Sequence, residues 1–396
     1  MRVNIKSLPY RIFIYAVACG LSIAVVNFIT TSLIHRISTT SSMLFPVLTI
    51  SLMGFHIMIA CFMGMKYLCD KKQLYLAPIA FAFTCSALLM LGTIGSYPDW
   101  LVCAQGREIN QNDALIFYFF RNIMMAILFI AAIFLYRVRH LTAHSRKIHG
   151  AVLMSCFIFI SATLILSWVH SSNSSLLSIE FIDNLTYTFT PLWHNRIGWL
   201  LIIIWSLTLI LLIGLTRLRN IFWYSGAFFC TAYIFTLLVL LSTVSGNAHS
   251  WNQARLFETL STLFLILILL GDVFILYRES NERYVRSYQN SIRDPLTRLY
   301  NRSYFYDTLT QRLSKASASQ PLSVIVCDLD RFKRINDTYG HVQGDKVIQF
   351  AASVLQNNVR QDDAAARIGG EEFAVLLVNI GANEALARSE EHTSEL

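Results

Sequence analysis

Charged residues are scarce in this chain. Asp, Glu, Lys and Arg together make up only 14% of its 396 residues, whereas hydrophobic residues make up 55%. Soluble globular domains contain about 25% charged residues, so the composition excludes a water-soluble globule for most of the chain. We therefore predict a membrane protein.

Cysteine pairs with the spacing of metal sites or disulfide frameworks are also missing. The eight cysteines are scattered, mostly within apolar stretches, and we interpret them as small packing residues. Three histidines, His140, His144 and His149, lie close together in the sequence. No acidic or cysteine residue accompanies them, so zinc binding is not favoured.

Long apolar runs, in contrast, are abundant. A helix needs roughly 20 apolar residues to cross a bilayer, and eight segments meet that length. They are residues 12–34, 43–65, 74–95, 114–136, 150–169, 197–216, 221–244 and 256–277. The first run is longer than the apolar part of a signal peptide and lacks a small-residue cleavage site, so we interpret it as a retained span.

The basic residues at the ends of these segments indicate the orientation. Twelve lie on the side of the N-terminus: Arg2, Lys6, Arg11, Lys66, Lys71, Lys72, Arg137, Arg139, Arg146, Lys147, Arg217 and Arg219. Four lie on the other side: Arg36, Arg107, Arg196 and Arg255. Because Lys and Arg accumulate in cytoplasmic loops, we predict a multi-pass protein of the bacterial inner (cytoplasmic) membrane with both termini in the cytoplasm. The net charge of +8 then reflects topology, and no nucleic-acid partner is expected.

Two longer loops on the predicted outer side, residues 96–113 and 170–196, contain several acidic and aromatic residues. The residues concerned are Asp99, Trp100, Glu108, Asp113, Glu180, Asp183, Tyr187 and Trp193. Such loops can receive an external signal, but we favour solvated connectors.

Ionisable residues inside the spans are rare, and each costs several kcal/mol unless it is paired or hydrated. Arg121, His56 and Asp272 are the candidates. Arg121 and Glu258 lie at a similar predicted depth, so they can form a pair, whereas Asp272 lies too near the inner face to be the partner of Arg121. Two interpretations stay open: a sensing site, or polar contacts that hold helices together, which we favour.

The sequence turns polar after Tyr277. No Gly or Pro occurs before Pro295, so we expect the last span to continue as a cytoplasmic signalling helix over residues 278–293. Pro295 ends this helix. The next helix is predicted from apolar residues at helical spacing, which are Tyr304, Phe305, Leu309 and Leu313.

Strand patterns follow in the last hundred residues. Leu322 to Cys327 is a short β-branched run, which predicts a buried strand ending in Asp328. An apolar helix is expected from about Lys346 to Val359. Beyond it, Gly369 and Gly370 separate two strand-like runs, as in a hairpin.

Two carboxylates of this region suggest metal chemistry. Asp328 and Glu371 would lie on neighbouring strands, where their oxygens suit Mg²⁺ with substrate phosphates completing the shell. Nucleotidyl transfer needs an activated hydroxyl and neutralised phosphate charge. Lys333 could help to neutralise that charge, and Glu371 could accept the hydroxyl proton. Taken alone, however, an acidic pair at a sheet end is equally compatible with a solvated edge.

The combined motifs are far more specific. Residues 328–345 read D-x-D-x-F-K-x-x-N-D-x-x-G-H-x-x-G-D, and residues 367–373 read R-x-G-G-E-E-F. This pattern closely resembles that of the GGDEF family of diguanylate cyclases. The resemblance extends from about Asp294 to Ile380 and includes the D-P-L-T-R-L-Y-N-R segment at its start.

The resemblance implies a role for each matching residue. It implies that Asp328, the Leu329 carbonyl and Glu371 bind Mg²⁺, that Lys333 stabilises the transition state and that Glu371 accepts the proton. It further implies that Asn336, His341 and Asp345 recognise GTP, while Gly369 and Gly370, which lack Cβ atoms, let the nucleotide approach the backbone.

The implied product is cyclic di-GMP, made from two GTP molecules held by two facing domains, so a homodimer is expected. Control of biofilm formation and motility is what the family implies. Arg360 and Asp363 match the family's R-x-x-D product-binding motif, which implies feedback inhibition by cyclic di-GMP. A solvated charge cluster is the alternative interpretation.

The predicted fold is thus a polytopic α-helical membrane domain of about eight spans followed by a cytoplasmic α/β (α+β) GGDEF domain related to the nucleotidyl-cyclase and polymerase palm. Residues 1–277 form the sensory domain, 278–293 the signalling helix and 294–387 a partial catalytic domain. Residues 388–396 read like a translated sequencing adapter, so we expect a non-native tail and an incomplete, inactive catalytic domain in this chain.

Two alternative functions remain at this stage. The soluble domain could be a catalytically inactive module that binds GTP or cyclic di-GMP, although the presence of both Glu371 and Lys333 argues against it. The membrane part could be a transporter or channel with a regulatory tail. The scarcity of charges within the spans disfavours a conduction path.

Overall fold

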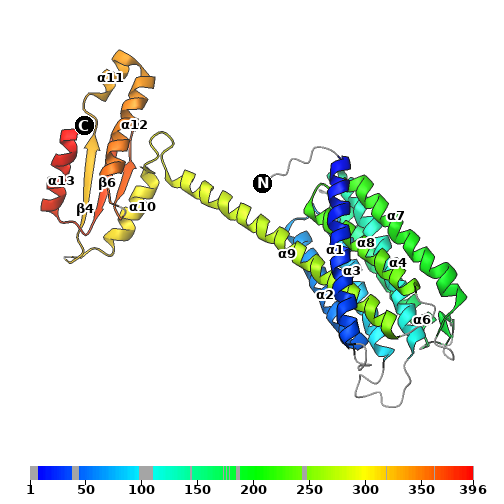
Figure 1. Ribbon diagram of the computed structural model, residues 1–396. Coiled ribbons are helices and arrows are strands. Elements are labelled where there is room, and N and C mark those ends of the chain that lie inside the picture. The colour runs from blue at the N-terminus through cyan, green and yellow to red at the C-terminus, as the bar shows by residue number, and fades with distance from the viewer. Residues whose placement is uncertain are drawn as a thin grey trace. The chain divides into compact units, whose positions relative to one another are not determined.

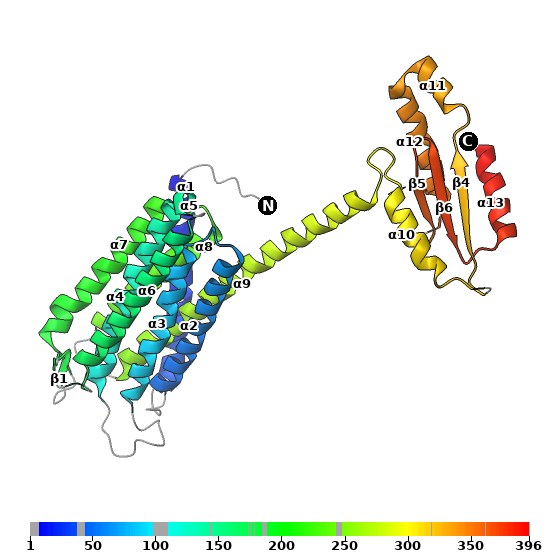
Figure 2. The same cartoon turned by 180° about the vertical axis from the view of Figure 1, so that it is seen from behind.

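A computed structural model describes residues 8–37, 44–97, 110–142, 145–172, 174, 176–177, 179–183, 188–242, 248–317, 319–360 and 362–395 (Figures 1 and 2). The chain divides into two compact units, Met1–Phe274 and Ile275–Leu396. Each unit is described by itself.

The first unit is a bundle of long helices. They are α1 (Leu8–Ile37), α2 (Leu44–Cys69), α3 (Leu76–Gly95), α4 (Gln111–Arg137), α6 (Arg146–His170), α7 (Gly198–Thr216), α8 (Ile221–Leu241) and α9 (Ala248–Ile292). Short elements join them: α5 (Arg139–Thr142), the two-residue strands β1 (Ile182–Asp183) and β2 (Thr188–Phe189), and a π-helical turn at Trp193–Ile197 that leads into α7. Within the described ranges, eight helices are long and apolar enough to cross a membrane, which confirms the predicted number of spans.

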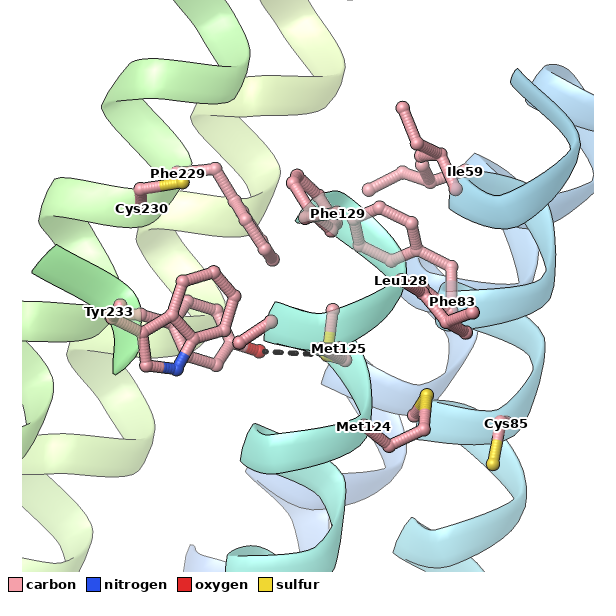
Figure 3. Close-up of a cluster of buried hydrophobic side chains, with 14 of the residues drawn as sticks. Ile59, Phe83, Cys85, Met124, Met125, Leu128, Phe129, Phe229, Cys230 and Tyr233 are labelled. Carbon is pink, nitrogen blue, oxygen red and sulfur yellow. Dashed lines mark hydrogen bonds between the residues drawn. The ribbon is translucent and has the colours of Figure 1, made fainter. Parts of the chain in front are cut away.

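The centre of the bundle is formed by α3 and α4. About two thirds of each of these spans is buried, against less than one fifth of α1. Figure 3 shows the packed core, in which Phe83, Phe129 and Phe229 converge from α3, α4 and α8. The Phe129 and Phe229 rings stack with centroids 5.4 Å apart, and the Tyr233 hydroxyl contacts the Met125 sulfur at 3.8 Å. Aromatic packing of this kind suits a bundle in lipid, because van der Waals contact drives association there.

Polar side chains inside the bundle connect neighbouring helices. His56 Nδ1 of α2 lies 2.8 Å from Ser86 Oγ of α3, and both residues are fully buried. The Trp205 indole N–H donates to Asn122 Oδ1 at 3.0 Å, which links α7 to α4. His56 therefore acts as a hydrogen-bonded contact between helices, the interpretation that the sequence favoured.

The described part of the loop 170–196 packs against the start of α4, so the expectation of a solvated connector is wrong there. Asn112 Nδ2 donates to the Ile179 carbonyl at 2.8 Å, and Asn112 Oδ1 accepts the Phe181 N–H at 2.7 Å. Asp113 accepts the Ser172 N–H at 2.9 Å. Trp193 is fully buried. Asp99, Trp100, Glu108 and Tyr187 lie outside the described residues.

The last helix of the first unit does not stop where its apolar part ends. Helix α9 runs without interruption for 45 residues to Ile292, which confirms the predicted continuation of the eighth span. Beyond Tyr277 its side chains are exposed, and two ion pairs link successive turns, Arg278 with Glu282 and Glu279 with Arg283. The helix ends three residues before Pro295, which cannot continue it.

The second unit is an α/β domain around a four-stranded sheet of order β3-β5-β6-β4. Its strands are β3 (Tyr300–Asn301), β4 (Leu322–Asp328), β5 (Ala364–Arg367) and β6 (Glu372–Val378), and its helices are α10 (Arg302–Leu313), α11 (Phe332–Tyr339), α12 (His341–Asn358) and α13 (Ala382–Glu395). Strands β5 and β6 form the predicted hairpin, and β6 also pairs antiparallel with β4. The predicted strands and helices of this region are confirmed.

The residues of β6 alternate between two cores. Phe373, Val375 and Leu377 pack with the apolar side of α12. Ala374 and Leu376 point to the other face, where Phe305 of α10 covers them. This period of two is what a strand requires when both faces of a sheet are buried. Strand β4 lies at the sheet edge, and Val326 on its outer face is 65% exposed.

Helix α13 continues through the segment that we predicted to be a non-native tail. It shows no break at residue 388, and Arg388 Nη1 lies 3.5 Å from the Asp363 carboxylate. The segment is therefore helical in this structure. Its origin as a translated adapter stays a prediction.

Candidate functional site

Three of the predicted site residues meet at one end of the sheet. Asp328 is the last residue of β4, and Glu371 directly precedes β6. The Leu329 N–H donates to the Glu371 carbonyl at 3.2 Å, which ties the two segments together. Asp328 is exposed and Glu371 is half-buried, so both carboxylates can reach a ligand.

The donors at this end fit a hard divalent cation. They are two carboxylates and a backbone carbonyl, the oxygen ligands that Mg²⁺ prefers. A third carboxylate is close, since Glu372 is the direct cross-strand partner of Asp328. The sequence analysis did not single out Glu372, although its place in the motif is a signal for it. Across the described residues, no three or more His, Cys, Asp or Glu side chains are arranged so that they could hold a metal ion by themselves. Substrate phosphates would have to complete the coordination.

The turn between β5 and β6 is held by backbone and side-chain hydrogen bonds. The N–H groups of Ile368 and Gly369 donate to the Glu372 carbonyl at 3.0 and 3.3 Å. A Cβ atom at Gly369 would overlap the Glu372 carboxylate, so the Glu372 side chain would have to move if residue 369 were not glycine. A Cβ atom at Gly370 would meet no atom within 4 Å, which leaves open space over the turn. The turn thus offers bare backbone to a ligand.

Arg367 and Asp294 position this turn, and the sequence analysis gave neither a role. Arg367 Nη2 donates to the Gly370 carbonyl at 2.7 Å, while Arg367 Nη1 lies 3.2 Å from Asp294 Oδ1. Asp294 also accepts the backbone N–H of Thr297 at 2.8 Å. Burial opposes ionisation of Asp294, but the Thr297 hydrogen bonds and the Arg367 charge outweigh it and lower the pKa of this carboxyl. Asp294 and Arg367 lie within the D-P-L-T and R-x-G-G motifs, but neither motif by itself indicates that the two residues pair.

The remaining predicted substrate residues lie on α11 and α12. Lys333 is on the first turn of α11, and Asn336 is near its end. Gly340 separates the two helices with φ of +81°, a conformation that favours glycine. His341 and Asp345 then occupy the first two turns of α12. Lys333, His341 and Asp345 are exposed, so their polar groups are free to meet a substrate.

Gly344 sets the distance between α11 and α12. A Cβ atom at this position would overlap the Asn336 amide oxygen and lie close to the Phe332 ring, so both side chains would have to move if residue 344 were not glycine. Asn336 is half-buried as a result. The structure therefore orients Asn336 through a glycine that the motif contained but that we had not assigned.

Arg360 and Asp363 lie away from the carboxylate site. Asp363 Oδ1 accepts the N–H of Val378, the last residue of β6, whereas Glu371 precedes the first residue of that strand. Seven strand residues separate the two ends, roughly 20 Å at the usual rise. Asp363 is nearly fully buried and also accepts the Arg360 N–H at 3.3 Å, while the Arg360 side chain is exposed. Arg360 therefore belongs to a separate surface, whereas the Asp363 carboxylate is buried and serves as a structural acceptor.

The membrane unit holds a second cluster of charges. Arg121 Nη2 lies 2.7 Å from Glu258 Oε1, which confirms the predicted pairing. Asp272 Oδ2 instead lies 3.6 Å from Lys66 Nζ, in agreement with the predicted position of Asp272 near the inner face. Arg255, which we had counted as a loop residue, is only 4% exposed and lies 3.0 Å from Glu258 Oε2. Its assignment to the loop was wrong, because α9 begins before it, at Ala248.

Fold and site together define a polytopic membrane protein joined to a nucleotide-cyclase type of α/β domain. Residues 39–277 match the family model "Membrane-associated sensor, integral membrane domain" (MASE4), and residues 291–396 match "Diguanylate cyclase, GGDEF domain". The first match covers more than half of the chain. The chain belongs to the MASE4 family of integral-membrane sensors and carries a diguanylate cyclase GGDEF domain.

Similar proteins match this chain over different lengths. The chain is 26% identical over 333 residues to "Probable diguanylate cyclase DgcT" of Escherichia coli, covering 83% of this chain and 71% of DgcT. It is 42% identical over 101 residues to "Diguanylate cyclase A" of Treponema denticola, covering 24% of this chain and 27% of that protein.

A solved structure of the coiled coil and GGDEF domain of DgcB from Caulobacter crescentus, in complex with c-di-GMP, is also similar to part of the chain. It is 31% identical, with a TM-score of 0.31, and the match covers 32% of this chain and 67% of that one.

Proposed function

We propose that this protein makes cyclic di-GMP and diphosphate from two GTP molecules in response to a signal received by its membrane unit. The observation that carries the proposal is the meeting of Asp328, Leu329 and Glu371 at one end of the sheet, joined by the Leu329 to Glu371 hydrogen bond. The likeness to DgcT supports it, because that likeness covers 83% of this chain.

The residues of the site suit phosphoryl transfer. Asp328, the Leu329 carbonyl and Glu371 would hold Mg²⁺, which supplies charge neutralisation at the phosphates when it is bound. Asn336, His341 and Asp345 provide hydrogen-bond partners for guanine and ribose. The space over Gly370 in the turn is open, so a nucleotide can approach the backbone closely there.

The reaction then proceeds by in-line displacement. Glu371 accepts the proton of the ribose 3′-hydroxyl, whose oxygen forms a bond to the α-phosphorus of the second GTP. The bond between that phosphorus and the bridging oxygen breaks, and diphosphate leaves with the electron pair. Lys333 stabilises the negative charge that develops in the transition state. A second, equivalent step closes the ring.

Two copies of the domain are required by this chemistry. One site supplies one GTP, and each ribose hydroxyl must attack the nucleotide held by the partner copy. A twofold-symmetric homodimer provides both attacks with a single arrangement. We further propose that the exposed Arg360, next to Asp363, binds product on the separate surface and lowers activity when cyclic di-GMP accumulates.

The placement of basic residues supports a location in the inner membrane with both termini in the cytoplasm. This orientation would give the catalytic domain access to cytoplasmic GTP. Signal reception is proposed for the membrane unit, whose buried charges and packed outer loop are described above.

The test is an activity measurement with a matched control. The chain, and a version extended from its genomic locus, are each expressed in membranes and supplied with GTP and Mg²⁺. We expect cyclic di-GMP from the extended protein, a loss of at least about 100-fold in Glu371→Gln, and normal turnover in Asp307→Asn. Asp307 is an exposed carboxylate on α10, outside the motifs.

Each outcome has a distinct meaning. Turnover in the extended protein but not in the shorter chain supports the expectation that this chain is inactive by itself. If the extended protein binds GTP but no product forms under any condition, a binding module is the better description. Equal activity in Glu371→Gln and the parent would overturn the proposed role of Glu371.

A further inference from the structure

The buried charge cluster of the membrane unit is not electrically balanced. Arg121, Arg255 and Glu258 are exposed by only 2%, 4% and 2%. Glu258 is the one carboxylate among the described residues that lies near both guanidinium groups. Two positive groups therefore share one negative group, which leaves a surplus of one positive charge inside the bundle. In a medium of low polarity, such a surplus charge destabilises the folded protein unless a counter-charge lies beside it.

The hydrogen-bonding groups around this surplus are unused donors. Arg121 Nη1, Arg255 Nε and the Trp251 indole N–H are buried and have no hydrogen-bond partner within the described ranges. Buried donors without acceptors are rare in folded proteins, and each one costs about 1–3 kcal/mol. A group that only accepts hydrogen bonds would satisfy donors of this kind.

A cavity lies beside two of these residues, Arg255 and Trp251. It is lined by Arg255, Glu258, Trp251, Tyr118 and Phe45, among others, and has a volume of about 20 Å³. That space is sufficient for one small ion or one water molecule. The cavity lies where α2, α4 and α9 begin, since Phe45, Leu115 and Trp251 all belong to the first turns of these helices.

Aromatic rings hold the guanidinium groups in place around the cavity. The Arg255 guanidinium carbon lies 4.8 Å from the centre of the Phe45 ring, and that of Arg121 lies 5.0 Å from the Tyr118 ring. Cation–π contacts stabilise a desolvated guanidinium by up to about 2 kcal/mol and leave its N–H edge available. The two arginines are thus fixed with donors still to be satisfied.

A second ion pair of the membrane unit is a simple contact between helices and serves as a comparison for the triad. Lys66 and Asp272 also join α2 to α9, but they are balanced one to one and about one fifth exposed. A pair of that kind needs no further partner. The contrast argues that the triad has a function beyond holding helices together.

We propose that a small monovalent anion, a halide or the carboxylate group of a small organic acid, binds in this cavity between Arg255 and Trp251, near the Glu258 carboxylate that Arg121 shares. The anion neutralises the surplus charge and accepts the unused hydrogen bonds of Arg255 and Trp251. Arg255 and Glu258 belong to α9, the continuous helix that reaches Ile292, so occupancy of the cavity acts on the element that leads into the catalytic domain. Binding itself does not depend on cyclase activity.

The experiment measures anion-dependent stability of the full chain in detergent. Chloride and formate are titrated separately at constant ionic strength against gluconate, whose polyol tail has no space in a cavity of this size. The unfolding midpoint is followed by tryptophan fluorescence. We expect a saturating rise of the midpoint, because a ligand that binds only the folded state stabilises it. A response to chloride alone assigns a halide site, and a response to formate assigns a carboxylate site.

Variants decide whether the response comes from this cavity. Arg255→Gln should weaken the apparent anion affinity at least about tenfold, the loss expected for one charge-assisted hydrogen bond. Glu258→Gln should strengthen it, because the arginines lose their competing carboxylate. Lys66→Gln, at the balanced pair, should leave it unchanged. Should Arg255→Gln fail to fold, Trp251→Phe removes one donor without removing charge and should weaken binding several-fold.

The proposal is overturned by either of two results. The first is a wild-type midpoint that responds equally to chloride, formate and gluconate without saturation. The second is an anion response that is the same in wild type, Arg255→Gln, Trp251→Phe and Lys66→Gln. In both cases the triad would be a structural contact between α4 and α9.

Discussion

The two units of this protein treat charged side chains in opposite ways. In the membrane unit, Arg121, Arg255 and Glu258 are almost fully buried and lie against one another. In the α/β unit, Asp328 and Lys333 are exposed at the ends of elements. A charged side chain inside lipid must be paired with another group of the protein. A charged side chain at the exposed end of a sheet can instead bind a ligand from water. The site of the α/β unit is therefore open, and that of the membrane unit is closed.

The backbone shows the same contrast. The spans are mostly regular α-helices whose backbone groups are satisfied internally, as lipid requires, although the span that contains α7 begins with the π-helical turn at Trp193–Ile197. The α/β unit departs from regular geometry where its site is formed, with φ of +81° at Gly340 and +58° at Arg331. Water can satisfy irregular backbone there. Function thus depends on side chains in the membrane unit and partly on backbone geometry in the α/β unit.

The largest effect on stability is expected where buried charges lose their partner. Glu258→Gln leaves two buried guanidinium groups without a counter-charge, so in gluconate we expect a loss of about 3–5 kcal/mol in unfolding free energy. Asp272→Asn, at the partly exposed pair, should cost less than about 1 kcal/mol. Denaturant titration of both variants measures the difference. Equal losses would show that burial does not distinguish the two pairs.

The next effect concerns the open site. Asp328→Asn removes a predicted metal ligand at the end of β4, so turnover should fall at least about 100-fold, equivalent to roughly 2.7 kcal/mol in the barrier. Its stability should hardly change, because Asp328 is exposed. Product formation and thermal unfolding are measured on the same preparation. A stable and fully active variant would remove Asp328 from the site.

A smaller effect is expected at the contact between α11 and α12. Gly344→Ala places a Cβ atom against the Asn336 amide, so we expect destabilisation by about 1–3 kcal/mol and a raised KM for GTP. Gly381→Ala is the matched control, because a Cβ atom there would meet nothing within 4 Å. Initial rates over a range of GTP concentrations separate KM from kcat. An unchanged KM in Gly344→Ala would mean that Asn336 does not contact the substrate.

The smallest effect concerns Asp294, which supports the turn through Arg367. The folded state lowers the pKa of this carboxyl below its ordinary value of 3.8, so its contribution is complete above that value and is lost as the pH falls through the lower, folded pKa. Asp294→Asn should therefore cost about 1 kcal/mol near neutral pH. It should also make stability less dependent on pH below the ordinary value. Unfolding curves at pH 7 and pH 3 test this, and a parallel acid dependence in both proteins would contradict it.

Much of the α/β unit was predictable because its signals are local. The β-branched run before Asp328, the paired glycines and the helix after Gly344 each depend on a few adjacent residues. What sequence reasoning missed were contacts between distant segments. The pair of Arg367 with Asp294 joins residues 73 positions apart, and no local pattern signals it.

In the membrane unit, hydropathy predicted the number of spans but not the packing between them. Arg255 was interpreted as a loop charge because it directly precedes the apolar run predicted to begin at residue 256. Only the start of α9 at Ala248 and the depth of Glu258 show that it is buried. The loop after α6 was misjudged for a similar reason, since its partner Asn112 lies 67 residues from Ile179.

The sequence by itself determined the two classes of structure in this protein, because apolar length decides what can cross a bilayer and the period of two decides what can form a sheet. It also determined the identity of the cyclase motif, whose residues are specific one by one. Only the tertiary structure decided which charges share a partner, which donors remain unused and which glycine sets the distance between helices. Those outcomes depend on how closely distant segments approach, and that distance results from the packing of the whole unit.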